Sequence, residues 1–185
     1  MKFTAVVIAV LTVGGCSRTP RTPVSSAQEG GGQPATAMPA QFSDLAPGDT
    51  AGVIAMMRGI MQGIDTQLGG LQERDTVLAA VADSQPRRLT VWVQDSVPRK
   101  LVVSDSGGNG PGAGETDVWF MGGDVSVIEE TDDIYALDFG AIVLWTDSSF
   151  QPRTDVDRDM FMARQTLLID RVRNWLAVLG LTFPD

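Results

Sequence analysis

The stretch from Thr116 to Asp147 contains one pattern twice, and this duplication constrains the fold more than any other feature of the sequence. Val118–Ile128 aligns without a gap on Tyr135–Trp145, at an offset of 17 residues. Each copy has an apolar run, a turn that contains glycine and a second apolar run, which is the pattern of a β-hairpin. The sequence therefore predicts two consecutive hairpins of the same kind.

The two turns give an expected register. With Gly122-Gly123 at the first turn and Phe139-Gly140 at the second, opposed residues and residues two apart share a face. Each hairpin then has one apolar face, formed by Val118, Phe120, Val125 and Val127 in the first copy and by Tyr135, Leu137, Ile142 and Leu144 in the second. Gly-Gly suits a type I′ turn. Phe139 would need a positive φ there, so the second turn is expected to be a bulged variant.

Trp119 and Trp145 fall on the opposite, mixed face in this register. If helices cover only one side of the sheet, this face is partly exposed, and its tryptophans are candidates for contact with a ligand or a partner. The alternative is that loops or the first helix cover them, because tryptophan is often largely buried without any function.

The segments around the duplication complete an α+β fold. Asp49 is expected to cap a helix that starts near Thr50, because apolar residues then recur at spacings of three and four. Leu89–Gln94 and Lys100–Val103 predict another hairpin, and Thr154–Asp157 has the pattern of a capped helix start, so a last helix is expected from there. The expected architecture is a meander-like antiparallel sheet of about six strands, in three hairpins, flanked by an N-terminal and a C-terminal helix. Residues 71–88 leave helix and strand both open.

Composition excludes several kinds of chemistry. The chain has no histidine and one cysteine, which removes histidine acid–base catalysis, Cys–His pairs, internal disulfides and the usual zinc ligand sets. A net charge of −9 argues against nucleic acid and against peripheral binding to anionic lipid headgroups. No residue set predicts a metal, a cofactor or a catalytic centre.

Carboxylates are the remaining candidates for chemistry. Glu129, Glu130, Asp132 and Asp133 lie within five residues but lack the spacing of a calcium-binding EF-hand loop, so a solvated acidic loop is favoured. Two acids such as Asp138 and Glu129 suffice for glycoside cleavage, although no spacing here fixes a pair. The arginines of the last helix, Arg158, Arg164, Arg171 and Arg173, are expected to be solvated.

The N-terminus has the pattern of a targeting segment. After Lys2, Phe3–Val13 carries no charge, and this run is shorter than the ~20 residues of a membrane-spanning helix. It has the length of a signal-peptide apolar region. Gly14-Gly15 then precede Cys16, the only cysteine of the chain.

These residues resemble the lipobox of bacterial lipoproteins. The resemblance implies cleavage between Gly15 and Cys16 and attachment of lipid, including palmitate, at Cys16. Ser17 rather than aspartate follows, which in that family implies delivery to the outer membrane of a Gram-negative host. An ordinary secretory signal with an incidental cysteine is the alternative.

The predicted organisation is a lipoprotein signal peptide at 1–15, a disordered tether at 16–41 and a single α+β domain at 42–185. The tether consists mainly of Ser, Thr, Pro, Gly, Ala and Gln and has too few apolar residues to fold. Its length corresponds to roughly 25–30 Å between lipid and domain.

The whole plan resembles small bacterial lipoproteins of uncharacterised function. Tyr135–Trp145, and more weakly Val118–Ile128, also resemble MORN-like and toxin–antitoxin-type hairpin repeats, with Phe139, Ala141 and Leu144 where those have polar residues. This resemblance brings no catalytic residues with it. The lipobox, the tether and the missing catalytic residue sets favour a lipid-anchored cell-envelope protein, facing the periplasm, that binds or supports an envelope protein or a glycan, and they favour a non-enzymatic role without deciding it. The alternative is a carboxylate-dependent envelope hydrolase that acts on glycan.

Overall fold

The computed structural model describes residues 41–79, 86–105 and 114–183. The predicted signal peptide, the lipidation site Cys16 and residues 16–40 of the predicted tether lie outside these ranges. Within them, no helix is both long and apolar enough to cross a membrane.

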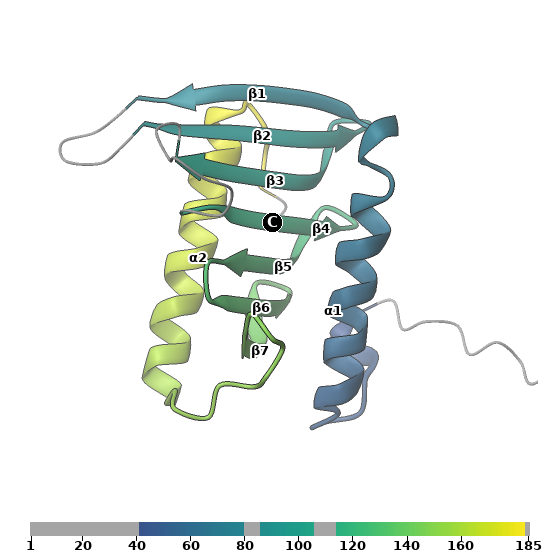
Figure 1. Cartoon of the computed structure of the whole chain (residues 1–185), viewed down its shortest axis with the longest axis vertical. Helices are drawn as coiled ribbons and strands as arrows, with labels where there is room; N and C mark the ends of the chain where they lie inside the picture. The colour runs from purple at the N-terminus through teal and green to yellow at the C-terminus, as the bar shows by residue number, and fades with distance from the viewer. Residues whose placement is uncertain (1–40, 80–85, 106–113, 184–185) are drawn as a thin grey trace, which may run out of the picture. The chain divides into compact units, whose positions relative to one another are not determined.

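The described residues form a seven-stranded antiparallel meander in which each strand pairs with its neighbours in the chain (Figure 1). The strands are β1 Gln72–Leu78, β2 Arg87–Gln94, β3 Val97–Asp105, β4 Thr116–Met121, β5 Asp124–Glu130, β6 Asp133–Asp138 and β7 Ala141–Asp147. The helices are α1 Thr50–Asp65 and α2 Arg158–Val178, with short 3₁₀ helices η1 Phe42–Asp44 and η2 Leu68–Gly70 on either side of α1 in the sequence. The predicted α+β meander between two helices is confirmed, with seven strands instead of about six.

The additional strand is β1, in the segment for which the sequence left helix and strand open. It pairs with β2 along its whole length, from Gln72 opposite Val93 to Leu78 opposite Arg87. Its side chains are mostly charged or polar, and Asp75 forms a 2.9 Å ion pair with Arg88 of β2. Charged residues are common on edge strands because they discourage pairing with other chains.

The first helix starts where the sequence predicts, and the second starts at the end of the predicted capping stretch Thr154–Asp157. Asp49 accepts a 2.9 Å hydrogen bond from the Gly52 backbone N–H, and Asp157 accepts one of the same length from Met160. Each aspartate satisfies one of the N–H groups that the first turn of a helix leaves without a partner. After α2, Gly180 adopts a φ of +69°, the left-handed conformation common just past a helix C-terminus.

The helices cover opposite faces of the sheet, so the sheet separates two apolar cores. Met57, Ile60 and Ile64 of α1 pack on the face with Trp119 and Val127. On the other face, α2 packs on side chains from β2 to β7, and Leu168, Val172, Trp175 and Leu176 are its buried residues. Consecutive residues of the central strands are therefore buried, which an antiparallel sheet with one solvated face does not show.

A β-bulge changes the expected register in both copies of the duplication. Trp119 pairs with Val127 and Phe120 pairs with Val125, which leaves Ser126 as the extra residue of β5. In the second hairpin the extra residue is Val143, because Ala136 pairs with Leu144 and Leu137 with Ile142. Ser126 and Val143 are 17 residues apart, so the bulge is duplicated together with the hairpin.

The bulges correct the predicted faces. Beyond each bulge the residues that follow change sides, so Tyr135 pairs with Trp145 and Val118 with Ile128. Trp119 keeps its expected face, which is the core beneath α1, whereas Trp145, beyond the second bulge, lies in the core beneath α2. Trp119 is only 2% exposed and Trp145 only 9% exposed. The prediction that the two tryptophans share one partly exposed face is wrong.

Candidate functional site

The two tryptophans have different polar surroundings in their cores. The Trp119 indole N–H donates a 2.9 Å hydrogen bond to Asp65 at the end of α1. Trp145 lies between the rings of Tyr135 and Phe161, with centroid distances of 5.1 Å and 5.7 Å, and its indole N–H has no partner within the described residues. Neither side chain offers a contact surface.

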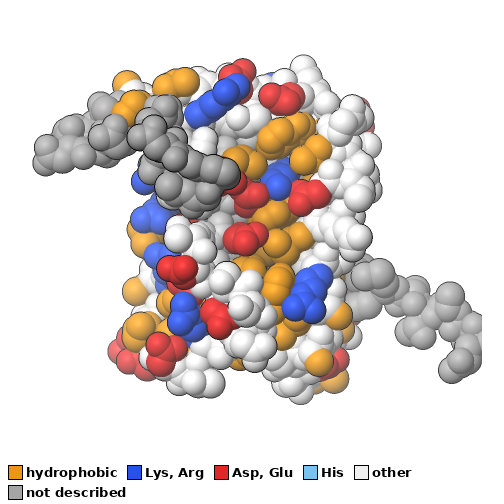
Figure 2. Space-filling model, viewed as in Figure 1, with side chains coloured by type: hydrophobic (Ala, Val, Ile, Leu, Met, Phe, Trp, Pro, Cys, Tyr) orange, Lys and Arg blue, Asp and Glu red, His pale blue; other side chains and the backbone are white. Residues whose placement is uncertain are grey.

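A charged cluster lies on the α1 face of the sheet, and we call Lys100, Asp65, Asp117, Trp119 and Glu129 the Lys100 cluster. The Lys100 ammonium donates to Asp65 at 3.0 Å, lies 2.9 Å from the Asp117 carboxylate, and stands 4.5 Å from the centre of the Trp119 ring. Strand pairing sets this geometry, because Lys100 of β3 is opposite Trp119 of β4. Figure 2 shows the surface next to α1 as a strip of apolar side chains interrupted by basic and acidic ones.

Two carboxylates of the Lys100 cluster face each other on neighbouring strands, since Asp117 pairs directly with Glu129. Burial raises the pKa of Asp117 more than Lys100 lowers it, and one Asp117 oxygen is buried without a hydrogen-bond partner in the described part of the chain. Burial, and then the charge of Asp117, also raise the pKa of Glu129. Burial lowers the pKa of Lys100, but the hydrogen bonds and charges of Asp117 and Asp65 together raise it above its ordinary value.

Beside this pair lies a pocket of about 180 Å³, lined by Glu115, Asp117, Glu129 and Thr131. The pocket is small and acidic, and two of its carboxyls have raised pKa values. A carboxyl group with a raised pKa is suited to holding a proton and releasing it to a bound group. This pair is the chemically most distinctive feature of the sheet surface.

Replacing Glu129 with glutamine should stabilise the protein at neutral pH by a few tenths to about 1 kcal/mol, because it removes a charge that burial and the opposed Asp117 carboxylate both disfavour. A raised pKa means that the folded state holds the proton more tightly than the unfolded state. Protonation of the Glu129 carboxyl therefore contributes its whole stabilisation below about pH 4, the pKa of a glutamate in the unfolded chain. This contribution is lost as the pH rises through the higher pKa that Glu129 has in the folded state. The advantage of Glu129→Gln should therefore shrink on acidification, in urea titrations at several pH values.

Glu73→Gln is the control for this measurement, since Glu73 is exposed on β1. Surface substitutions of this kind usually change the free energy of unfolding by less than about 0.5 kcal/mol, which is the result expected for Glu73→Gln at neutral pH. If Glu129→Gln destabilises the protein at neutral pH, the charged form of Glu129 makes a favourable contact and the proposed repulsion is not dominant.

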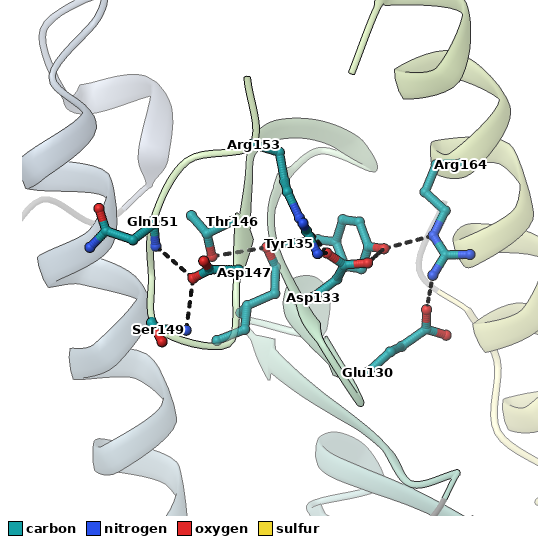
Figure 3. A network of polar contacts seen from close by, with 10 residues as sticks. Glu130, Asp133, Tyr135, Thr146, Asp147, Ser149, Gln151, Arg153 and Arg164 are labelled. Atoms are coloured by element: carbon teal, nitrogen blue, oxygen red, sulfur yellow. Dashed lines mark hydrogen bonds and ion pairs between the residues drawn. The ribbon is translucent and has the colours of Figure 1, made fainter. Parts of the chain in front are cut away.

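On the other face, α2 is attached to the sheet through Glu130, at the end of β5. Glu130 forms ion pairs with Arg164 and, at 3.0 Å, with Arg171. Arg164 also donates a 2.8 Å hydrogen bond from Nε to the Tyr135 hydroxyl, as Figure 3 shows. One carboxylate therefore holds two arginines, about two helical turns apart, against the sheet.

The network continues through Asp133 to the loop before α2. Arg153 donates to one Asp133 oxygen from Nε at 2.9 Å and from a terminal nitrogen at 2.7 Å. The Tyr135 hydroxyl makes a longer 3.4 Å bond to the other oxygen of the same carboxylate. Burial raises the pKa of Tyr135 despite the nearby Arg164, so the phenol stays protonated and can donate this bond.

These contacts correct the predicted acidic loop. Glu129, Glu130 and Asp133 belong to strands, and the latter two are partners of arginines. Arg164 and Arg171 are not simply solvated, whereas Arg173 pairs with Asp170 on the exposed surface. In the described residues no group of three or more acidic, histidine or cysteine side chains is arranged to hold a metal ion.

The structure does not bring Glu129 and Asp138 together. Ile134 is opposite Glu129, and Asp138 lies four residues further along β6, a distance of about 13 Å along an extended strand. Carboxylates that cleave glycosides lie about 5 to 9.5 Å apart. The partner that sequence reasoning missed is Asp117, because without the bulge at Ser126 it would be opposite Ile128.

Comparisons of the chain with protein-family models, with curated proteins and with solved structures found no match.

Proposed function

We propose that the chain is a lipid-anchored cell-envelope protein whose folded part serves as a non-enzymatic binding or scaffold module. The observation that carries the proposal is Cys16, the only cysteine, directly after Gly14-Gly15 and the apolar run Phe3–Val13. Each buried methylene of an acyl chain contributes about 0.8 kcal/mol, so several chains on one cysteine give stable anchoring. The membrane is the first partner, and an envelope protein or glycan is the second.

The non-enzymatic role is supported by how the charged groups are used. In the Lys100 cluster and around Glu130, basic side chains pair with acidic ones and join helices to the sheet. The sequence has no histidine to serve as a general base near neutral pH. The proposed location is the outer membrane, with the domain facing the periplasm.

Replacing Cys16 with serine should abolish acylation and release the protein from membrane fractions, because the thiol is the proposed attachment point. Incorporation of labelled palmitate, together with fractionation of envelopes, measures both effects. Ser17→Ala is the matched control and should keep the label and the location. Ser17→Asp should keep the label and move the protein to the inner membrane of a Gram-negative host. Labelling of Cys16→Ser at the wild-type level would contradict the proposal.

The second candidate is a carboxylate-dependent envelope hydrolase acting on glycan, with Glu129 and Asp117 in place of Glu129 and Asp138. The opposed carboxyls with raised pKa values at the 180 Å³ pocket favour it. If this is correct, purified protein degrades peptidoglycan and Glu129→Gln loses about 10²-fold or more of the rate, whereas Asp138→Asn does not. Absence of turnover by the wild-type protein excludes it.

A further inference from the structure

The turn between β6 and β7 contains Phe139 in a backbone conformation that phenylalanine rarely adopts. Phe139 has a φ of +47° and Gly140 a φ of +76°. Such turns strongly prefer Asn, Asp or Gly at the first position. Glycine has no Cβ to clash at positive φ, and Asn and Asp tolerate this conformation better than other side chains do, so a bulky residue such as phenylalanine is strained there. The Phe139 residue is also 70% exposed, the highest value among the exposed large hydrophobic residues of the described chain.

The duplication provides an internal comparison for this residue. Gly122 occupies the same position 17 residues earlier, with a φ of +66°, and is followed by Gly123 at +103°. The first copy therefore builds the same hairpin without strain and without an exposed ring. Neither the turn nor the core requires the ring of Phe139, and backbone strain together with exposed apolar surface is typical of contact sites.

Two pockets lie beside Phe139. One, of about 430 Å³, is bounded by the turn and by residues of α2, including Gln165, Ile169 and Arg173. The other, of about 310 Å³, extends to η1 and the β4–β5 turn. Pockets of this size, with an apolar wall and a few polar groups, are typical of binding sites.

The polar groups beside Phe139 include three carboxylates and one cation, Arg173. Asp124 lines both pockets, and Asp138 lines the second. Asp170 in the first pocket is already paired with Arg173. The Asp124 and Asp138 carboxylates, in contrast, have no ion-pair partner among residues 41–79, 86–105 and 114–183. The site therefore combines an aromatic ring with two carboxylates whose charge is uncompensated.

Other aromatic rings of the described chain stack with basic side chains. Arg58 lies 4.3 Å from the centre of the Phe150 ring, and Arg173 lies 5.2 Å from that of Phe183. The same cation–ring contact occurs between Lys100 and Trp119 and between Arg164 and Tyr135. In both of these pairs a carboxylate also lies close to the cation. Phe139 has the ring and the carboxylates of this arrangement, and no cation stacked on it within the described residues.

We propose that the Phe139 turn is a docking site for a protein segment that presents a basic side chain, arginine or lysine, next to apolar ones. The cation lies over the Phe139 ring between the Asp124 and Asp138 carboxylates, and the apolar neighbours enter the two pockets. A cation on an aromatic face and opposite charges at short range both favour this occupant. The inference rests on the proposed binding role and names its partner, and it does not depend on lipid attachment.

The test uses the full chain in a nonionic detergent, with a short peptide of alternating arginine and leucine as the probe. Its matched control is the same peptide with glutamate in place of arginine. Amide chemical shifts measured by NMR should change at Phe139 and Gly140, and Phe139→Gly should weaken the affinity about tenfold. Asp124→Asn with Asp138→Asn should weaken it about fivefold and reduce its dependence on salt.

Two further measurements separate binding from folding. Phe139→Gly should raise the equilibrium constant of folding about fivefold, because it removes the strain at positive φ. Val77→Thr, at an exposed apolar residue of β1 on the opposite edge of the sheet, should leave the affinity unchanged.

Three outcomes overturn the proposal outright, and a fourth overturns the location of the site. The three are equal binding of the arginine and glutamate peptides, wild-type affinity in folded Phe139→Gly, and shifts at Phe139 and Gly140 caused by a chitin oligosaccharide but not by the arginine peptide. Peptide binding with shifts elsewhere in the domain overturns this site and supports the broader binding role. Loss of the lipid anchor in the Cys16→Ser experiment leaves the docking site intact, since the protein is measured in detergent.

Discussion

Replacing Glu130 with glutamine should lower the free energy of unfolding by about 2 to 3 kcal/mol. The Glu130 side chain is 13% exposed and is paired with Arg164 and Arg171, whose side chains are 25% and 40% exposed. Loss of one partner from a fully buried ion pair costs about 3 to 5 kcal/mol because the other charge stays buried, and the partial exposure of the arginines reduces this figure. The amide of glutamine keeps the size of the side chain, so the change removes charge rather than packing.

Asp170→Asn is the matched control for Glu130→Gln. Asp170 also pairs with an arginine of α2, Arg173, but both side chains are more than half exposed. Exposed pairs contribute little, so the control should cost less than about 0.5 kcal/mol. Urea unfolding with an unchanged m-value gives both numbers. Similar losses in the two variants would show that Glu130 contributes no more to the attachment of α2 than a surface ion pair does.

Elements specified by residues close in sequence were predictable. The caps at Asp49 and Asp157 bond to N–H groups three residues away, and the apolar periodicity of the helices extends over a few turns. The meander was predictable for the same reason, because each of its strands pairs with the preceding strand. β1 was not assigned, since its charged residues form a strand by pairing along β2 rather than through a periodic apolar pattern of their own.

The bulges were not predictable from spacing alone. A regular hairpin would also have residues at the positions of Ser126 and Val143, so the sequence does not mark them as unpaired. Packing of the apolar cores on both faces of the sheet determines which residue of the strand is left without a cross-strand partner. A bulge moves every residue beyond it to the other face, so one such feature per copy was enough to misplace Trp145. The unbroken apolar run Val118–Met121 in β4 is the sequence signal that could have indicated two covered faces.

The clusters depend on contacts across long stretches of chain. Trp119 binds Asp65, which lies 54 residues earlier, and Glu130 binds arginines 34 and 41 residues later. Neither contact can be derived without knowing which face each helix covers. The turn at Phe139 is an intermediate case. Its sequence already showed an unsuitable residue for a type I′ turn, but only the structure shows that the ring is exposed between two pockets.

Trp119→Phe should cost about 2 to 3 kcal/mol, whereas Trp145→Phe should cost less than about 1 kcal/mol. Both substitutions remove part of a buried ring, but only the first removes a hydrogen bond to a carboxylate, which contributes about 1.5 to 3 kcal/mol. In Trp145 the indole N–H is buried without a partner within the described residues, so its removal also removes an unfavourable group.

Urea unfolding of both variants and of the double variant gives the two values and tests whether they add. The residues lie in separate cores on opposite faces of the sheet, so near-additivity is expected. Oxidation of the native protein by N-bromosuccinimide should be slow at both tryptophans, since each is buried. Equal costs for the two substitutions would show that the bond from Trp119 to Asp65 contributes nothing net. In that case the Lys100–Asp65 ion pair and the apolar contacts of α1, rather than the indole N–H, would hold the helix on that face.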